Sequence, residues 1–197
     1  MTTKLPPALS RAIDLLADPP ANPDVSKGYL DLLKDVPHTD TTPKNRGAIQ
    51  AVWASGLGSM LYDNAQAFAR KVVSAWQLPI EWLNIASGGV ALDVGGGPGN
   101  VTGSLARAAG PDGLALGVDI SEPMLARAVS AEAGPNVGFL RADAQQLPFR
   151  DASFDAVTSV AVLQLIPNPS TTLAEIVRVL KPGGRVAIMV PTAGRGG

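Results

Sequence analysis

The chain has 197 residues, no cysteine, a single histidine and a formal net charge of −1 at pH 7. This length suits one domain with a sizeable core, and the lack of cysteine excludes a disulfide framework, a cysteine nucleophile and the usual Cys/His zinc site. The 16 Lys and Arg residues form no basic block, so we expect no nucleic-acid partner.

The N-terminal segment, residues 1–88, is predicted to be a helical cap. Apolar residues recur at helical spacing within 5–17, 29–36, 49–61 and 65–76. The segment holds all three Trp and both Tyr of the chain. These aromatic side chains either pack inside the cap or line an apolar substrate pocket beneath a lid, and Tyr62 is the one we expect to contact a ligand.

The same segment carries no targeting or membrane signal. Asp14 and Asp18 interrupt its first apolar stretch, which argues against a signal peptide. No apolar run approaches the roughly 18 to 20 residues that span a bilayer. We therefore expect a cytoplasmic protein without a membrane span.

From residue 89 to residue 197, strand and helix patterns alternate, which predicts a second region built on a parallel sheet covered on both faces. The expected strands are residues 90–94, 114–118, 137–141, 156–160 and 186–190. Helices are expected after the first, second and fourth strands, the second of them starting at Ser121 as N-cap.

A glycine-rich bend, residues 95–99, joins the first of these strands to its helix. Glycine has no Cβ, so such a run lets the backbone pass close to a small molecule. The spacing does not fit the G-x-G-x-x-G pattern of dinucleotide sites, because the sixth position falls on Asn100 or Thr102. Residues 90–106 contain no Lys or Arg, so a phosphate-binding P-loop is also disfavoured.

Acidic residues follow two further strands. Asp119 stands 26 positions after Asp93, where the second strand ends, and Asp143 follows the third strand. The carboxyl ends of parallel strands share one edge of a sheet, so both carboxylates are expected beside the bend. A carboxylate in that position can accept the hydroxyl protons of a ribose, although each residue could instead serve only to cap a turn.

The run Asp93-x-Gly95-x-Gly97-x-Gly99 resembles motif I of the class I S-adenosylmethionine-dependent methyltransferases. The resemblance continues in family order through Asp119, residues 142–144, residues 147–157 and residues 180–185. It is most similar to the small-molecule enzymes that include the ubiquinone and menaquinone methyltransferases. Those relatives often have a histidine where this chain has Gln164.

This resemblance implies a Rossmann-like parallel sheet of order 3-2-1-4-5 and S-adenosylmethionine as cofactor, with S-adenosylhomocysteine as product. Glycines would allow close approach of the backbone, Asp119 would bind the ribose, Asp143 and Ala144 the adenine, and Asp93 would order the bend. The expected cofactor-binding residues are Asp93, Gly95, Gly97, Gly99, Asp119, Ile120, Asp143 and Ala144.

Methyl transfer from a sulfonium requires alignment and exclusion of water, and it requires no metal. We expect the substrate, a small apolar or aromatic metabolite, to lie near Tyr62, Leu163 and Gln164, with Tyr62 and Gln164 as catalytic candidates. One alternative is a methyltransferase-like module that binds the cofactor without turnover. A second, a nicotinamide-dependent oxidoreductase, is disfavoured by the glycine spacing.

The end of the chain departs from the family pattern, in which a helix and an antiparallel strand pair follow the fifth strand. Only seven residues follow residue 190, so we expect the fifth strand to be an edge. Three explanations remain for how this edge is covered: by the N-terminal helices, by a second subunit in a homodimer, or by a further part of a longer protein.

Overall fold

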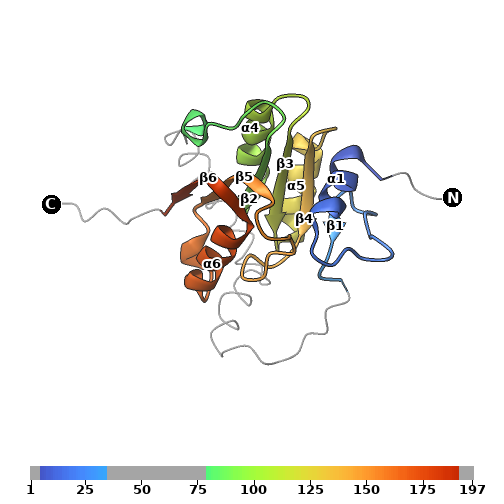
Figure 1. Ribbon diagram of the computed structural model, residues 1–197. Helices are drawn as coiled ribbons and strands as arrows, with labels where there is room; N and C mark the ends of the chain where they lie inside the picture. Colours follow the sequence, from blue (N-terminus) through green and yellow to red (C-terminus); the bar gives the residue numbers. More distant parts are fainter. Residues whose placement is uncertain (1–4, 35–78, 191–197) are drawn as a thin grey trace. The chain divides into compact units, whose positions relative to one another are not determined.

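A computed structural model describes residues 5–34 and 79–190, and residues 5–34 belong to the same compact unit as residues 80–190. Its centre is a six-stranded, wholly parallel sheet with the order β1-β4-β3-β2-β5-β6 (Figure 1). The strands are β1 (Leu30–Asp31), β2 (Val90–Val94), β3 (Leu114–Asp119), β4 (Val137–Arg141), β5 (Phe154–Val160) and β6 (Leu180–Met189). The predicted order of five strands, here β4-β3-β2-β5-β6, is confirmed, and β1 adds a sixth strand at one edge.

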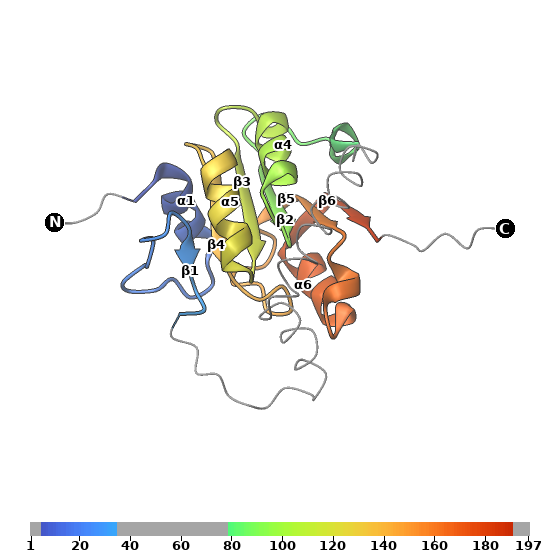
Figure 2. The same ribbon diagram turned by 180° about the vertical axis from the view of Figure 1, so that it is seen from behind.

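Helices cover both faces of the sheet. The helices α4 (Asn100–Ala109) and α5 (Glu122–Glu132), with the short helix η1 (Ile80–Leu83), pack on one face. The helices α1 (Pro7–Leu15) and α6 (Pro169–Val179) pack on the other, as the two opposite views show (Figures 1 and 2). Because the central strands are covered on both faces, their sequences are mainly apolar, with a few buried polar residues such as Asp93 and Thr158.

The N-terminal helix α1 is part of this core. Leu9 and Ala12 are buried against β3 and β4, and Arg11 Nη1 donates to the carbonyl of Gly113 at 2.6 Å. α1 therefore forms part of the layer that covers the sheet. A lid role for the N-terminal segment stays a prediction, because its residues 35–78 lie outside the described part of the chain.

The helix predicted within residues 29–36 is wrong where the structure describes it. Leu30 and Asp31 form β1, with Leu30 opposite Leu140 of β4. The Asp31 carboxylate accepts from the backbone N–H of Leu33 at 3.0 Å, a local turn that competes with helix formation. Burial of Leu30 in the sheet outweighs the apolar spacing that suggested a helix.

The last strand begins earlier than predicted. β6 starts at Leu180, directly after α6, and Leu180 pairs with Phe154. Its register against β5 then shifts, so that Arg185 pairs with Ala156, and residues 181–184 form the irregularity between these two pairs. Within the described residues, each helix is too short or too polar to cross a membrane.

Candidate functional site

The glycine-rich bend lies at the carboxyl end of β2, in the middle of the sheet. It is tied to the neighbouring strand, because the N–H groups of Gly95 and Gly96 both donate to the carbonyl of Val118, at 2.8 and 3.0 Å. Gly95, Gly97 and Gly99 have positive φ angles of 74°, 51° and 91°. Residues with a Cβ rarely adopt this conformation, so the path of the bend requires glycine.

The three glycines differ in what surrounds them. A Cβ on Gly95 would lie 2.3 Å from Cγ2 of Val162, and one on Gly99 would lie 3.0 Å from Cζ of Phe139. A Cβ on Gly97 would meet nothing within 4 Å. Two of the glycines are therefore explained by packing within the protein, whereas Gly97 faces open space.

Asp119 lies beside this open glycine, at the end of β3. Its Oδ2 accepts from the N–H of Gly97 at 2.9 Å, and its Oδ1 accepts from the N–H of Ser121 at 2.8 Å. Burial raises the pKa of the Asp119 carboxyl, although these backbone donors oppose the shift. Ser121 is the N-cap of α5 as predicted, but its hydroxyl makes no capping bond. The next residue, Ile120, is 54% exposed.

Asp93 lies beneath the bend and is 1% exposed. Its Oδ2 accepts from the Thr102 hydroxyl at 2.7 Å, and its Oδ1 accepts from the Thr158 hydroxyl at 2.8 Å. Burial raises the pKa of Asp93 to about 6, the two hydroxyl donors oppose the rise, and the charge of Asp119 adds to it. Asp93 thus joins β2, α4 and β5 under the bend.

The two threonines that hold Asp93 were missed in the sequence. Thr158 is directly opposite Asp93 in the β2–β5 register, so a polar residue inside an apolar strand was the available signal. Thr102 fits because Gly117 has no side chain: a Cβ there would lie 2.8 Å from the Thr102 hydroxyl. The sheet register and one glycine therefore create the pocket for the buried carboxylate.

Asp143 and Ala144 lie in the turn after β4. The Asp143 Oδ1 accepts from the N–H of Gln145 at 2.8 Å, which closes a local turn. Ala144 is half-buried against the core. Asp143 therefore caps this turn, which was one of the two roles that the sequence allowed for it.

The expected substrate residues lie after β5, in and around η2 (Leu163–Leu165). Leu163 is buried, Gln164 is exposed, and Val162 covers Gly95. Just before them, Ala161 has a φ of 56°, an uncommon value for a residue other than glycine. Tyr62, the other candidate, lies outside the described residues.

The charge around the bend suits a nucleoside better than a phosphate. Arg141 is a cation near the bend, and its Nε donates to the carbonyl of Ile120 at 3.3 Å. Its Nη1 is paired with Asp31 at 3.3 Å and with Glu122 at 3.1 Å. An acidic group, an open glycine and a neutralised arginine fit a ligand with hydroxyl groups and positive charge, as S-adenosylmethionine has.

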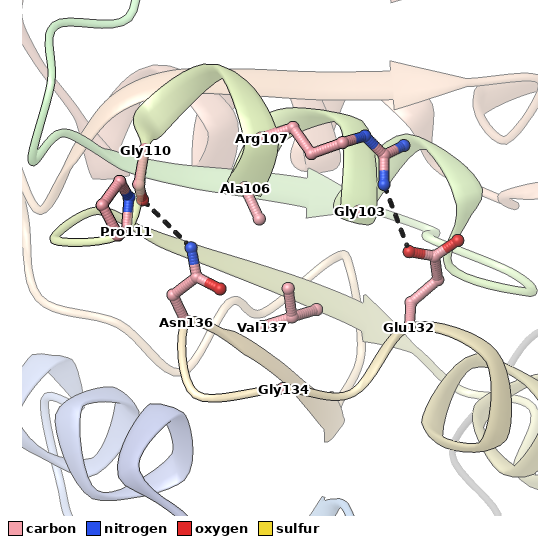
Figure 3. Close-up of a pocket in the computed structure, with 9 residues that line it drawn as sticks. All are labelled: Gly103, Ala106, Arg107, Gly110, Pro111, Glu132, Gly134, Asn136 and Val137. Carbon is pink, nitrogen blue, oxygen red and sulfur yellow. Dashed lines mark hydrogen bonds and ion pairs between the residues drawn. The ribbon is translucent and has the colours of Figure 1, made fainter.

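One hollow among the described residues lies elsewhere in the fold (Figure 3). It measures about 400 Å³ and runs between α4 and the connection from α5 to β4. Arg107 and Glu132 face each other across it at 3.6 Å, and Asn136 donates to the carbonyl of Gly110 at 3.0 Å. Val137, which lines this hollow, is the first residue of β4, so the hollow reaches the amino ends of the strands, away from Asp119.

Comparisons with known proteins agree with the resemblance seen in the sequence. The family model of a methyltransferase domain matches residues 92–188. The ubiquinone/menaquinone biosynthesis C-methyltransferase UbiE of Saccharophagus degradans is 38% identical over 117 residues, 57% of this chain and 47% of that protein. The chain thus spans about half the length of the curated relatives it matches.

Two solved structures show the same fold. A SAM-dependent methyltransferase from Aquifex aeolicus is 27% identical, with a TM-score of 0.51 over 55% of this chain and 60% of that one. The [4+2]-cyclase SpnF is 33% identical, with a TM-score of 0.50 over 55% of this chain and 40% of that one. Together with the parallel sheet, the glycine bend and Asp119, these findings identify residues 92–188 as a methyltransferase domain of the class I S-adenosylmethionine-dependent family, whose cofactor is S-adenosylmethionine.

Proposed function

We propose that this chain transfers the methyl group of S-adenosylmethionine to a small apolar or aromatic metabolite. The observation that carries the proposal is the pairing of Gly97 with Asp119. The backbone of Gly97 faces open space, and the carboxylate that accepts its N–H has further lone pairs for ligand hydroxyls.

The proposed cofactor contacts divide by type. Gly97 gives the cofactor room against the backbone, and Asp119 accepts from the ribose hydroxyls. Ile120, Asp143 and Ala144 contact the adenine. Asp93 acts from below as a positioning residue, because it is 1% exposed and bonded to two threonines.

S-adenosylmethionine supplies an electrophilic methyl group on a sulfonium that is already a good leaving group. The protein then has to hold the acceptor in line and exclude water, and such positioning is worth on the order of several kcal/mol of the barrier. Val162 presents apolar surface after β5, beside the bend, and the neighbouring Leu163 is buried. We assign Gln164 and Tyr62 to orienting the acceptor.

An apolar or aromatic acceptor is supported by two observations. Ile120 and Leu165, both at the carboxyl ends of the strands, are 54% and 55% exposed, so apolar surface is available there. The relative from Saccharophagus degradans carries the name of a ubiquinone and menaquinone C-methyltransferase. Quinone precursors are therefore the first acceptors to test.

A second function is a cofactor-binding domain without methyl transfer. The [4+2]-cyclase SpnF is as similar to this chain in fold as the methyltransferase from Aquifex aeolicus, so the fold alone does not fix the reaction. Both functions require that S-adenosylmethionine binds at Gly97 and Asp119.

Calorimetric titration with S-adenosylmethionine and S-adenosylhomocysteine tests the shared step. The Gly97→Ala variant places a methyl group where the ligand lies, so we expect affinity to fall more than tenfold. Gly183→Ala is the matched control, because Gly183 also has a positive φ, of 79°, and a Cβ there also meets nothing within 4 Å. An alanine is strained to a similar degree at both positions, because both have a positive φ. An equal loss of affinity in the two variants would therefore contradict the assignment of the site.

A methyl-transfer assay with labelled S-adenosylmethionine and aromatic or quinone-type acceptors then separates the two functions. Labelled product that disappears in Gly97→Ala supports the enzyme. Cofactor binding without product from these acceptors or from cell extract supports the binding domain. No affinity for either nucleoside in a folded protein would refute both.

A further inference from the structure

The turn between β3 and α5 lies at the carboxyl edge of the sheet. Bonding of the sheet ends at Asp119, whose carbonyl accepts from the N–H of Ala142 at 3.2 Å. Bonding of the helix begins at Ser121, whose carbonyl accepts from the N–H of Leu125 at 3.0 Å. The chain changes from strand to helix between these two bonds, directly beside the proposed ribose ligand Asp119.

The residue between the two bonds, Ile120, is held through its backbone. Its side chain is 54% exposed, so burial gives it little anchorage. Its carbonyl accepts from Nε of Arg141, the last residue of β4, at 3.3 Å. Arg141 is opposite Asp119 in the register of the two strands. A side chain of the neighbouring strand therefore holds the backbone next to the proposed ribose ligand.

Two carboxylates fix the guanidinium group of Arg141. Its Nη1 lies 3.3 Å from Oδ2 of Asp31 in β1, and 3.1 Å from Oε1 of Glu122 at the start of α5. The side chain of Asp31 is 6% exposed and that of Arg141 is 22% exposed, so this ion pair is largely shielded from water and from salt. The position of Arg141 is thus set by β1 and α5 together.

The N-terminal segment also holds Glu122. The Oε2 atom of Glu122 accepts from Nζ of Lys27 at 2.5 Å and from the hydroxyl of Tyr29 at 3.2 Å. The Tyr29 side chain is buried, and a Cβ on Gly28 would lie 2.7 Å from Cγ1 of Val129 in α5. This segment therefore packs closely on α5, at the edge of the sheet where Figure 2 shows β1.

We propose that Arg141 is a positioning residue for S-adenosylmethionine, and that residues 27–31 support the cofactor site through it. Arg141 fixes the backbone of Ile120, and so fixes how the adjacent Asp119 presents its carboxylate to the ribose. Residues 27–31 lie outside residues 92–188, so the family match does not account for this support. The inference rests on the proposed function, because it requires the adenosine end of the cofactor to lie at Asp119 and Ile120.

The Arg141→Lys variant separates position from charge. Arginine donates through Nε and both Nη atoms in a rigid fork, whereas lysine has a single nitrogen. Lysine can stay near Asp31 and Glu122, but it cannot hold the carbonyl of Ile120 at the same time. We expect the affinity of the full chain for S-adenosylhomocysteine, measured by calorimetry, to fall about tenfold. The number of binding sites per chain should stay unchanged, because a variant that was only destabilised would lose sites rather than affinity.

Arg11→Lys is the matched control. The guanidinium group of Arg11 also donates to a backbone carbonyl, that of Gly113, at 2.6 Å. Gly113 directly precedes β3, so this bond lies at the opposite end of the strand from Asp119. We expect Arg11→Lys to lower the melting temperature and to leave the affinity unchanged. Equal loss of affinity in the two lysine variants, or unchanged affinity in Arg141→Lys, would overturn the inference.

A milder variant, Glu122→Gln, decides the question if Arg141→Lys fails to fold. It removes one of the two charges that hold Arg141 and keeps the size of the side chain. We expect affinity to fall about two- to fivefold, as for loss of a partly exposed ion pair. Its control is Glu132→Gln at the other end of α5, where Glu132 is paired with Arg107 at 3.6 Å. Equal affinities in these two glutamine variants would count against the role of Arg141.

The same titrations separate this inference from the proposed function. If the unmodified chain binds S-adenosylhomocysteine, and Arg141→Lys and Glu122→Gln bind it equally well, the inference alone is overturned. If the unmodified chain binds neither this nucleoside nor S-adenosylmethionine, the proposed function is overturned and the inference with it.

Discussion

The buried carboxyl of Asp93 makes a prediction about stability and pH. Its pKa is raised from 3.8 to about 6 in the folded chain, because burial disfavours the charged form. The folded chain therefore holds this proton more tightly than the unfolded chain does. Stability from this group is fully present below about pH 4 and is lost as the pH rises toward 6 and above.

The size of the effect follows from the shift. Two pKa units correspond to about 3 kcal/mol, since each unit is worth about 1.36 kcal/mol. Asp93→Asn stays neutral at every pH and lacks this loss. We therefore expect the stability of the unmodified chain, relative to Asp93→Asn, to fall by about 3 kcal/mol between pH 4 and pH 7.

Urea unfolding of both proteins across this pH range measures the difference. Other carboxyls, such as Glu122 and Glu175, have lowered pKa values and make stability rise with pH, but they act equally in both proteins and cancel. Thr158→Val removes a hydrogen bond that opposes the shift, so it should enlarge the loss. A difference between the unmodified chain and Asp93→Asn that stays constant with pH would refute the reasoning.

Two further predictions concern the bend. Gly95→Ala should be severely destabilised, because its Cβ would lie 2.3 Å from Val162 and its φ is 74°; thermal unfolding of Gly95→Ala with Val162→Ala should show partial rescue, and no rescue would mean that backbone strain alone is responsible. Asp119→Asn should bind S-adenosylmethionine about 10- to 150-fold more weakly, as expected for loss of a charged acceptor worth about 1.5 to 3 kcal/mol. Burial raises the pKa of Asp119, so as the pH is lowered the affinity of the unmodified chain for S-adenosylmethionine should begin to fall at a pH above the ordinary carboxyl range. Calorimetry on Asp119→Asn should show no such pH dependence. Asp112→Asn, remote from the bend, is the control variant.

The central part of the fold could be predicted from local patterns. Three segments that follow one another in the sequence form it: the strand Val90–Val94, the glycines after it and the helix from Asn100. The pattern of these segments also indicated the protein family. The placement of Asp119 beside the bend followed because carboxyl ends of parallel strands meet at one edge, and the bond from Gly97 to Asp119 fits that expectation.

Features that depend on distant pairing could not be predicted in the same way. β1 was missed because Leu30 becomes a strand residue only through its partner Leu140. The different surroundings of Gly95 and Gly97 depend on Val162, which comes from the end of another strand. The partners of Asp93 required the register between β2 and β5, which sequence periodicity does not give.

The pairing of Leu30 with Leu140 also has a consequence for synthesis of the protein. This edge of the sheet cannot form until the ribosome has made more than a hundred residues beyond β1, because its partner strand ends at Arg141. Until then the apolar face of α1, with Leu9 and Ala12, has no surface to cover. During translation this apolar face therefore stays uncovered until β3 and β4 emerge, and transiently exposed apolar surface of this kind favours aggregation.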